Sequence, residues 1–176
     1  MEHALRQLIR TIPDFPRPGI QFKDITPLLQ DARGFRMAID WFSLTVNAAG
    51  EVDLVAGIES RGFILGAALA ARLGVGFIPL RKQGKLPAKK ARVSYQLEYG
   101  NDALEMHVDA VRSGDRVALV DDLLATGGTA EAACQLLQQC GAEIVAVSFL
   151  IELDFLQGRK NIKSVKSEKI FSLIHY

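Results

Sequence analysis

The chain has 176 residues, of which 49% are hydrophobic, and its formal net charge is +1. This length suits one domain with a single hydrophobic core. Because 21 basic residues nearly balance 20 acidic ones, we expect no generally basic surface, which argues against nucleic-acid and membrane-surface binding. An anionic ligand would therefore need a local site.

The N-terminal residues and the cysteines favour a cytoplasmic protein. Charges interrupt the apolar positions of residues 1–15, and no later segment has about eighteen uncharged apolar residues, so we expect neither a signal peptide nor a membrane span. Cys134 and Cys140 lie in a predicted helix without the spacing of a metal or redox motif. We interpret them as reduced, buried thiols.

The N-terminal region includes the stretch FPRPGIQFKDITPLL, within residues 12–30. Its three prolines favour extended and turn conformations, so we expect no helix there. From the residues alone, this stretch is a segment packed on the edge of a sheet.

Strand and helix patterns alternate through the rest of the chain. Apolar runs rich in β-branched residues are typical of buried parallel strands, and helical patterns between them end at glycines, where helices commonly stop. The strands are expected at residues 52–58, 75–80, 117–121 and 144–151, and the helices at 33–49, 61–73 and 129–140. This order predicts a single α/β domain, residues 1–176, with a mostly parallel sheet flanked by helices.

Residues 81–115 interrupt this alternation with a long, charged segment rich in turn-forming residues. Its pieces RVSYQLEY and ALEMHV have alternating patterns that favour an antiparallel ribbon. Long excursions of this kind are usually lids or binding loops. For Lys89, Lys90 and Arg92 the alternative is an ordinary solvated run of charges.

The stretch ALVDDLLATGGTA joins a predicted strand to a helix through two carboxylates and a glycine-rich turn, residues 125–129. Ligands of parallel sheets lie beyond the carboxyl ends of the strands, and the free N–H groups of a helix N-terminus attract anions. This turn therefore predicts a phosphate-binding loop, although a plain threonine-capped turn is equally compatible with its four residues. Asp121 and Asp122 would repel a phosphate, so we expect them to face ribose hydroxyls or Mg²⁺.

The stretch GIESRGF repeats this strand-loop-helix pattern after residue 58. Backbone amides and the Arg61 guanidinium suit a second anion, because arginine binds paired oxygens well. The alternative is that Ser60 caps the helix and Arg61 is a surface residue.

LVDDLLATGGT resembles the 5-phosphoribosyl 1-pyrophosphate motif of the type I phosphoribosyltransferases. DFPRPGIQFKDITPLL, ESRGF, RKQGKLP and LEYG follow the order found in the adenine-using branch of that family. The resemblance covers roughly residues 10–155 and is least clear over residues 154–176. It implies a homodimeric enzyme of purine salvage that converts adenine and 5-phosphoribosyl 1-pyrophosphate to AMP and pyrophosphate with Mg²⁺.

The resemblance also implies roles for particular residues. Residues 12–30 would form a hood over the base, with Phe22 stacked on adenine, and residues 85–102 a mobile lid whose Glu98 assists proton transfer at the purine. A cis peptide before Ser60 would turn amides toward pyrophosphate. Mg²⁺ would be held mainly by the substrate, with Asp121 or Asp122 as the candidate protein contacts. The catalytic candidates are Glu98, Arg61, Asp121 and Asp122, and the further substrate-binding candidates are Gln21, Phe22, Lys23, Glu59, Ser60, Lys82, Lys85, Tyr99, Ala125, Thr126, Gly127, Gly128 and Thr129.

Three alternatives remain open at this point. The same reaction could use a 6-oxopurine or orotate; the fold could serve a regulator that senses the phosphoribosyl ligand; or the chain could be an inactive relative. A regulator is expected to carry a nucleic-acid-binding domain or a basic face, for which this chain has neither the length nor the charge. His3, His107 and His175 lack ligand spacing and receive no catalytic role, and no Ser/His/Asp arrangement indicates a covalent hydrolase.

Overall fold

The computed structural model describes the backbone of residues 1–97 and 100–176, and the side chains outside residues 96–101. The described chain divides into two compact units, Met1–Trp41 and Phe42–Tyr176. Each unit is described separately below.

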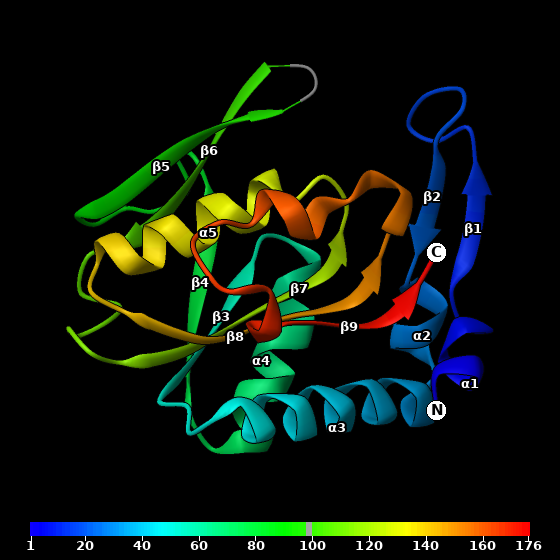
Figure 1. The fold of residues 1–176 in the computed structure, drawn as a ribbon, viewed down its shortest axis with the longest axis horizontal. Helices are drawn as coiled ribbons and strands as arrows, with labels where there is room; N and C mark the ends of the chain where they lie inside the picture. The colour runs from blue at the N-terminus through cyan, green and yellow to red at the C-terminus, as the bar shows by residue number, and fades with distance from the viewer. Residues whose placement is uncertain (98–99) are drawn as a thin grey trace. The chain divides into compact units, whose positions relative to one another are not determined.

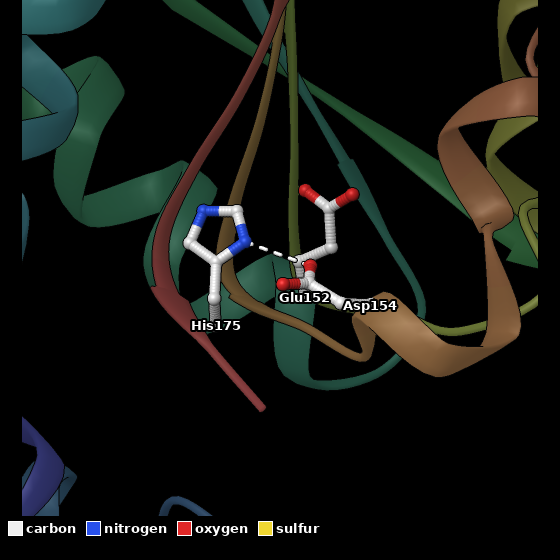
Figure 2. A group of neighbouring side chains, drawn as sticks. All are labelled: Glu152, Asp154 and His175. Atoms are coloured by element: carbon white, nitrogen blue, oxygen red, sulfur yellow. Dashed lines mark hydrogen bonds and ion pairs between the residues drawn. The ribbon is translucent and has the colours of Figure 1, made fainter.

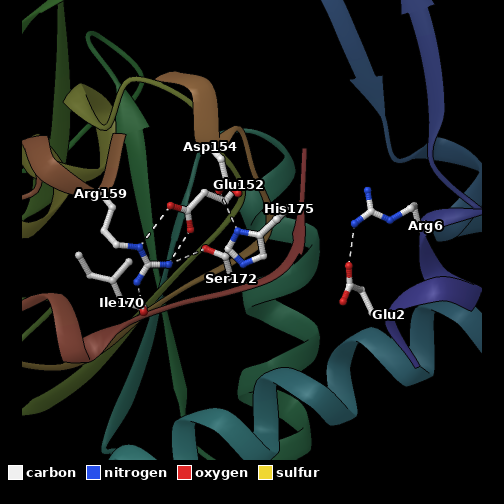
Figure 3. Close-up of polar contacts among 8 residues, drawn as sticks. All are labelled: Glu2, Arg6, Glu152, Asp154, Arg159, Ile170, Ser172 and His175. Carbon is white, nitrogen blue, oxygen red and sulfur yellow. Dashed lines mark hydrogen bonds and ion pairs between the residues drawn. The ribbon is translucent and has the colours of Figure 1, made fainter. Parts of the chain in front are cut away.

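The N-terminal unit contains a small antiparallel sheet. Strands β1 (Arg10–Pro13) and β2 (Gln21–Asp24) pair with Ile12 opposite Phe22, and both are visible in blue in Figure 1. The unit also holds α1 (Glu2–Arg6), α2 (Thr26–Gln30) and the start of α3 (Ala32–Ala49). An ion pair of 2.7 Å between Glu2 and Arg6 spans one turn of α1 (Figure 3).

The prediction that residues 15–29 contain no helix is wrong from Thr26 onward, where α2 (Thr26–Gln30) begins. Pro27 lies in the first turn of this helix, where its fixed φ suits the helix and its missing N–H has no intrahelical partner to lose. The Asp24 carboxylate accepts hydrogen bonds from the Thr26 backbone N–H (2.9 Å) and hydroxyl (2.6 Å). These bonds stabilise the start of the helix in place of a standard cap.

The C-terminal unit is built on a seven-stranded sheet in the order β5-β6-β4-β3-β7-β8-β9. Strands β4, β3, β7, β8 and β9 are mutually parallel, while β5 and β6 form an antiparallel hairpin paired to β4. The mostly parallel sheet and the antiparallel ribbon are both confirmed. The strands are β3 (Leu54–Ile58), β4 (Gly76–Lys82), β5 (Lys90–Leu97), β6 (Gly100–His107), β7 (Arg116–Leu124), β8 (Glu143–Glu152) and β9 (Ile170–His175).

Helices α4 (Arg61–Leu73) and α5 (Gly128–Gln139) cover opposite faces of this sheet (Figure 1). Helix α4 connects β3 to β4, and α5 connects β7 to β8, so the two connections run toward opposite edges of the sheet. Because both crossovers are right-handed, the two helices lie on different faces. Helix α4 has the predicted bounds and ends at Gly74, whose φ of +72° few other residues adopt. Both helices therefore begin at the same edge of the sheet, just after β3 and β7.

The core of this unit lies between the sheet and α5, and includes Leu80, Leu104, Leu119 and Phe149. Cys134 belongs to it, and burial raises the pKa of its thiol to about 12. Cys140 is half-buried and also free. No helix in the described part of the chain is both long and apolar enough to cross a membrane.

After β8 the chain forms three short 3₁₀ turns and the last strand. The turns are η1 (Asp154–Leu156), η2 (Gly158–Asn161) and η3 (Ser167–Lys169). Strand β9 then pairs in parallel with β8, and the Tyr176 N–H donates to the Glu152 carbonyl (2.9 Å). This segment, which had no interpretable motif, is an integral part of the sheet.

Candidate functional site

A cavity of about 470 Å³ opens at the carboxyl ends of β3 and β7. Two strand-to-helix segments, residues 58–61 and 121–127, form most of its wall. The remaining lining residues are Lys82, Tyr95, Asp102, Thr129, Ala130 and Phe149. The structure therefore brings ten predicted site residues to one cavity: Glu59, Ser60, Arg61, Lys82, Asp121, Asp122, Ala125, Thr126, Gly127 and Thr129.

Strand β7 extends to Leu124, beyond the predicted end at residue 121, and this extension determines where Asp121 and Asp122 lie. Its pairing with β3 stops at Val120, but its pairing with β8 continues to Leu124. Asp121 and Asp122 therefore lie within β7, on the part that extends past its pairing with β3, and not at its last residue. Asp121 is half-buried and Asp122 is only 5% exposed.

The two carboxylates have different partners. A nitrogen of Arg61 lies 2.6 Å from Asp122 Oδ2, whereas Asp121 Oδ1 accepts the Asp122 backbone N–H (2.9 Å). Burial raises the pKa of Asp121 well above its usual range, and the neighbouring negative charge of Asp122 raises it further. A sugar hydroxyl or a cation beside Asp121 would stabilise its ionised form.

Helix α4 approaches this pair closely because its first turn contains Gly62. A Cβ atom on Gly62 would lie 2.8 Å from Asp121 Oδ1 and 2.9 Å from the Val120 carbonyl oxygen. Both contacts are too short for a side chain. The small residue in ESRGF thus lets Arg61 reach across to β7.

The phosphate-loop prediction rests on residues 125–129, which lead from β7 into α5. Gly127 caps the helix with φ of +85°, and its carbonyl accepts the first helical hydrogen bond, from Glu131 N–H (2.9 Å). No threonine side chain caps α5, so the plain threonine-capped turn is not formed. The loop lines the cavity through Ala125, Thr126, Gly127 and Thr129, whereas Gly128 is the first residue of α5.

Glu59 is the anchor of the second strand-to-helix segment. The peptide bond between Glu59 and Ser60 is cis, as the family resemblance implied. The Glu59 carboxylate accepts hydrogen bonds from Lys85 Nζ (2.7 Å), the Lys82 backbone N–H (3.0 Å) and Arg81 Nε (3.3 Å). Burial by itself would raise the pKa of Glu59, but these donors outweigh it and lower the pKa to about 2. Ser60 precedes α4 without a capping hydrogen bond from its side chain.

The β5–β6 hairpin contributes two lining residues that sequence reasoning missed. Asp102 pairs with Lys82 Nζ at 3.1 Å and accepts a hydrogen bond from the Tyr95 hydroxyl at 3.3 Å. A further side-chain hydrogen bond joins Tyr95 to Thr129 of the phosphate loop. Tyr95 and Asp102 are register partners in the hairpin, so the alternation of the predicted ribbon was the signal that could have indicated them.

Several predicted site residues are not among those that line the cavity. Gln21, Phe22 and Lys23 lie on β2 in the N-terminal unit, where Phe22 packs edge-on against Phe15 with ring centroids 5.2 Å apart. Glu98 and Tyr99 lie outside the described residues. Their roles stay predictions.

A separate cluster of metal-ligating side chains lies at the end of β8 and β9. Figure 2 shows Glu152, Asp154 and His175, whose ligand atoms lie within 4.8 Å of one another. Asp154 pairs with His175 Nδ1 at 2.8 Å, and Glu152 is held by Arg159 through contacts of 2.6 and 3.2 Å (Figure 3). A guanidinium already satisfies the buried carboxylate, so we assign this cluster a structural role.

Comparison with known proteins gives consistent matches over the whole chain. The family described as "Phosphoribosyl transferase domain" matches residues 24–174. An adenine phosphoribosyltransferase of Synechococcus sp. (strain JA-3-3Ab) is 60% identical over 156 residues, which cover 89% of each chain.

Solved structures agree. The crystal structure of adenine phosphoribosyltransferase from Thermoanaerobacter pseudethanolicus has a TM-score of 0.95 and 49% identity, and covers 100% of both chains. The enzyme from Saccharomyces cerevisiae, complexed with D-2,5-dideoxy-2,5-imino-altritol 1,6-bisphosphate and adenine, has a TM-score of 0.92 and 39% identity over 98% of this chain and 97% of that one.

Proposed function

The chain belongs to the phosphoribosyl transferase family, and we propose that it makes AMP and pyrophosphate from adenine and 5-phosphoribosyl 1-pyrophosphate in purine salvage. It is a pentosyltransferase of class EC 2.4.2.7. The observation that carries this proposal is the single cavity into which a glycine-rich loop, an acidic pair and Arg61 all converge.

Each part of the cavity suits one part of the phosphoribosyl substrate. The loop at residues 125–129 offers helix N-terminal amides to the 5-phosphate. Asp121 and Asp122 accept hydrogen bonds from the ribose hydroxyls next to it. Arg61, Lys82 and Lys85 bind the pyrophosphate, with the amides of residues 59–61 as further donors. Most of this binding energy serves to hold the reacting atoms in place.

The reaction is a substitution at the anomeric carbon of ribose. The bond from that carbon to the pyrophosphate oxygen breaks, a bond to N9 of adenine forms, and N9 loses its proton. The transition state resembles an oxocarbenium ion, so nearby carboxylates stabilise it and cationic groups stabilise the departing pyrophosphate. We propose that Glu98 assists the proton transfer and that Tyr99 contacts the substrate beside it.

Mg²⁺ is the proposed cofactor, and the residues of the cavity fit it. Asp121 and Asp122 offer carboxylate oxygens, which are the ligands that Mg²⁺ prefers. A divalent cation would also offset the cost of the buried negative charge that raises the pKa of Asp121. When bound with the substrate, Mg²⁺ neutralises charge on the pyrophosphate leaving group.

Base recognition is proposed for the N-terminal unit, with Phe22 stacking on adenine and the backbone of residues 21–23 bonding its edge. Residues 85–102 are proposed as a lid that excludes water.

We also propose that residues 1–176 act as one domain, in a cytoplasmic homodimer. Size-exclusion chromatography with light scattering tests the dimer.

A radiolabelled-base assay tests the function. The chain is incubated with 5-phosphoribosyl 1-pyrophosphate, Mg²⁺ and labelled adenine, hypoxanthine, guanine or orotate in turn. We expect labelled AMP from adenine, little product from the other bases, and loss of product when EDTA removes Mg²⁺. A higher rate with another base would overturn the substrate assignment, and no product with any base would overturn the activity.

A further inference from the structure

We propose that the C-terminal segment 157–164, called the brace below, positions the phosphate loop 125–129, and that Gly158 and Asn161 are its positioning residues. The proposal rests on the proposed function of that loop. It assigns a role to a segment that lines no part of the cavity among the described residues.

The first observation is a direct contact between two glycine backbones. A Cβ atom on Gly158 would overlap the carbonyl oxygen of Ala125 and lie 3.0 Å from the Gly127 nitrogen. A Cβ atom on Gly127 would in turn overlap the Gly158 carbonyl oxygen. The loop and the brace can approach this closely only because both positions lack a side chain.

The second observation is a hydrogen bond to the loop itself. Asn161 Nδ2 donates to the carbonyl oxygen of Thr126 at 2.7 Å. This bond fixes the trans peptide between Thr126 and Gly127, in which the Gly127 N–H points opposite to the Thr126 carbonyl and so away from Asn161. A Thr126 carbonyl that is bonded to the brace is kept from turning toward a phosphate bound at the start of α5, so we infer that the bond favours the loop orientation that binds phosphate.

The third observation extends the contact into the first turn of α5. The Glu131 carboxylate accepts hydrogen bonds from the backbone N–H groups of Lys163 (2.8 Å) and Ser164 (3.0 Å) and from the Ser164 hydroxyl (2.8 Å). The brace thus holds both the loop and the start of the helix that supplies its free amides.

The brace is itself fixed to the sheet. Arg159 donates to Glu152 on β8 at 2.6 and 3.2 Å, to the Ile170 carbonyl at 2.5 Å and to Ser172 Oγ at 3.4 Å (Figure 3). Ile162 is only 4% exposed and packs in the core. A segment anchored at two points can resist movement of the loop that it contacts.

A positioning role and a general structural role can be told apart by the ligands whose binding they affect. Ribose 5-phosphate carries only the 5-phosphate, whereas inorganic pyrophosphate is expected at the Glu59–Arg61 segment. Loosening the loop should weaken the binding of ribose 5-phosphate and leave the binding of pyrophosphate unchanged. A general loss of structure should weaken both and lower Tm.

The experiment measures Kd for ribose 5-phosphate and for pyrophosphate with Mg²⁺ by calorimetry, in wild type, Asn161→Ala, Asn161→Asp and Gly158→Ala. We expect about three- to tenfold weaker ribose 5-phosphate binding for Asn161→Ala, and a larger loss for Asn161→Asp, whose carboxylate faces the Thr126 carbonyl. Pyrophosphate affinity should stay within about twofold and Tm within about 2 °C. Asn47→Asp, the same change at an exposed position of α3, is the matched control and should bind both ligands as wild type does.

The outcomes separate this proposal from the proposed function. Wild-type protein that makes no AMP and binds no ribose 5-phosphate would contradict the function. An active wild type with Asn161 variants of unchanged ribose 5-phosphate affinity, or of equally weakened pyrophosphate affinity, would overturn the brace alone. Gly158→Ala should show the same selective loss more strongly, and if it fails to fold the Asn161 variants decide the question.

Discussion

Arg61 on α4 and Asp122 on β7 form an ion pair of 2.6 Å. The residue proposed to bind pyrophosphate is therefore paired with a residue proposed to bind ribose. The carboxylate is almost fully buried and the side chain of Arg61 is 30% exposed. The guanidinium can therefore turn part of its donor set to an anion while it still neutralises Asp122. Pyrophosphate binding should therefore depend on Arg61, and the buried Asp122 carboxylate loses its cationic partner when Arg61 is removed.

Arg61→Ala should impair binding of the diphosphate-bearing substrate far more than binding of AMP. Charge-assisted hydrogen bonds contribute about 1.5–3 kcal/mol, so we expect roughly 10- to 100-fold weaker binding of 5-phosphoribosyl 1-pyrophosphate by calorimetry. Arg112→Ala, an exposed arginine near the opposite end of β7, is the control. Equal losses for AMP and for the diphosphate substrate would contradict the assignment.

Asp121→Asn should stabilise the free protein and weaken catalysis. A carboxyl with a raised pKa stabilises the fold at low pH, and that contribution is lost as the pH rises through the raised value. At neutral pH the ionised Asp121 costs stability because it is buried, and the uncharged amide does not. We therefore expect the free energy of unfolding to rise by about 1 kcal/mol, or Tm by about 2–4 °C. Scanning calorimetry over a pH series should show a gain in Tm that grows as the pH rises.

Asp122→Asn is the matched comparison, because it leaves the Arg61 charge without its partner. Burial raises the pKa of Asp122 as well, but Arg61 opposes that rise, so the Tm of Asp122→Asn should lie below that of Asp121→Asn, and both variants should lose kcat/KM. If Asp121→Asn lowers Tm at pH 8 as much as Asp122→Asn does, the electrostatic account of the pair is wrong. Unchanged turnover in the double Asn variant would remove the catalytic role of both residues.

Strong local signals account for the parts of the fold that could be predicted. Helix 61–73 has the predicted bounds because an apolar pattern, a preceding loop and a terminal glycine all agree there. Prediction failed at Thr26–Gln30, where proline was taken to exclude a helix that it instead begins. The contact of Gly158 with Gly127 joins residues about thirty positions apart, and no local pattern indicates such a contact.

Glu59→Gln should weaken pyrophosphate binding without direct loss of a pyrophosphate ligand. The ionised Glu59 holds Lys85 and the Lys82 backbone, and an amide would hold a lysine less strongly. Because its pKa is lowered to about 2, this contribution to stability is complete above the usual glutamate pKa and fades as the pH falls toward about 2. Binding titrations from pH 5 to 8 should therefore show a constant difference between wild type and Glu59→Gln. A difference that vanishes at pH 5 would contradict the low pKa.

The proposed closure of the lid, residues 85–102, is tested by limited proteolysis. Lys89 precedes β5 and is exposed, whereas Lys90 is paired with Glu105 at 3.1 Å. Trypsin should cut the free protein near Lys89 or Arg92, and more slowly once 5-phosphoribosyl 1-pyrophosphate and Mg²⁺ are bound. Equal cutting rates with and without ligand would contradict a lid.

The ratio of kcat/KM for adenine to that for hypoxanthine tests the central claim most directly. Adenine offers an amino donor and an N1 acceptor where hypoxanthine offers an oxygen acceptor and an N–H donor. If the backbone of residues 21–23 reads this edge, hypoxanthine meets two reversed pairings of about 1–3 kcal/mol each. We therefore expect a ratio of roughly a hundred or more, kept in Gln21→Val because backbone atoms do the reading, while Phe22→Ala weakens binding of every purine. Comparable values for the two bases would contradict the adenine assignment, and a Gln21→Val variant without the preference would show that a side chain reads the base.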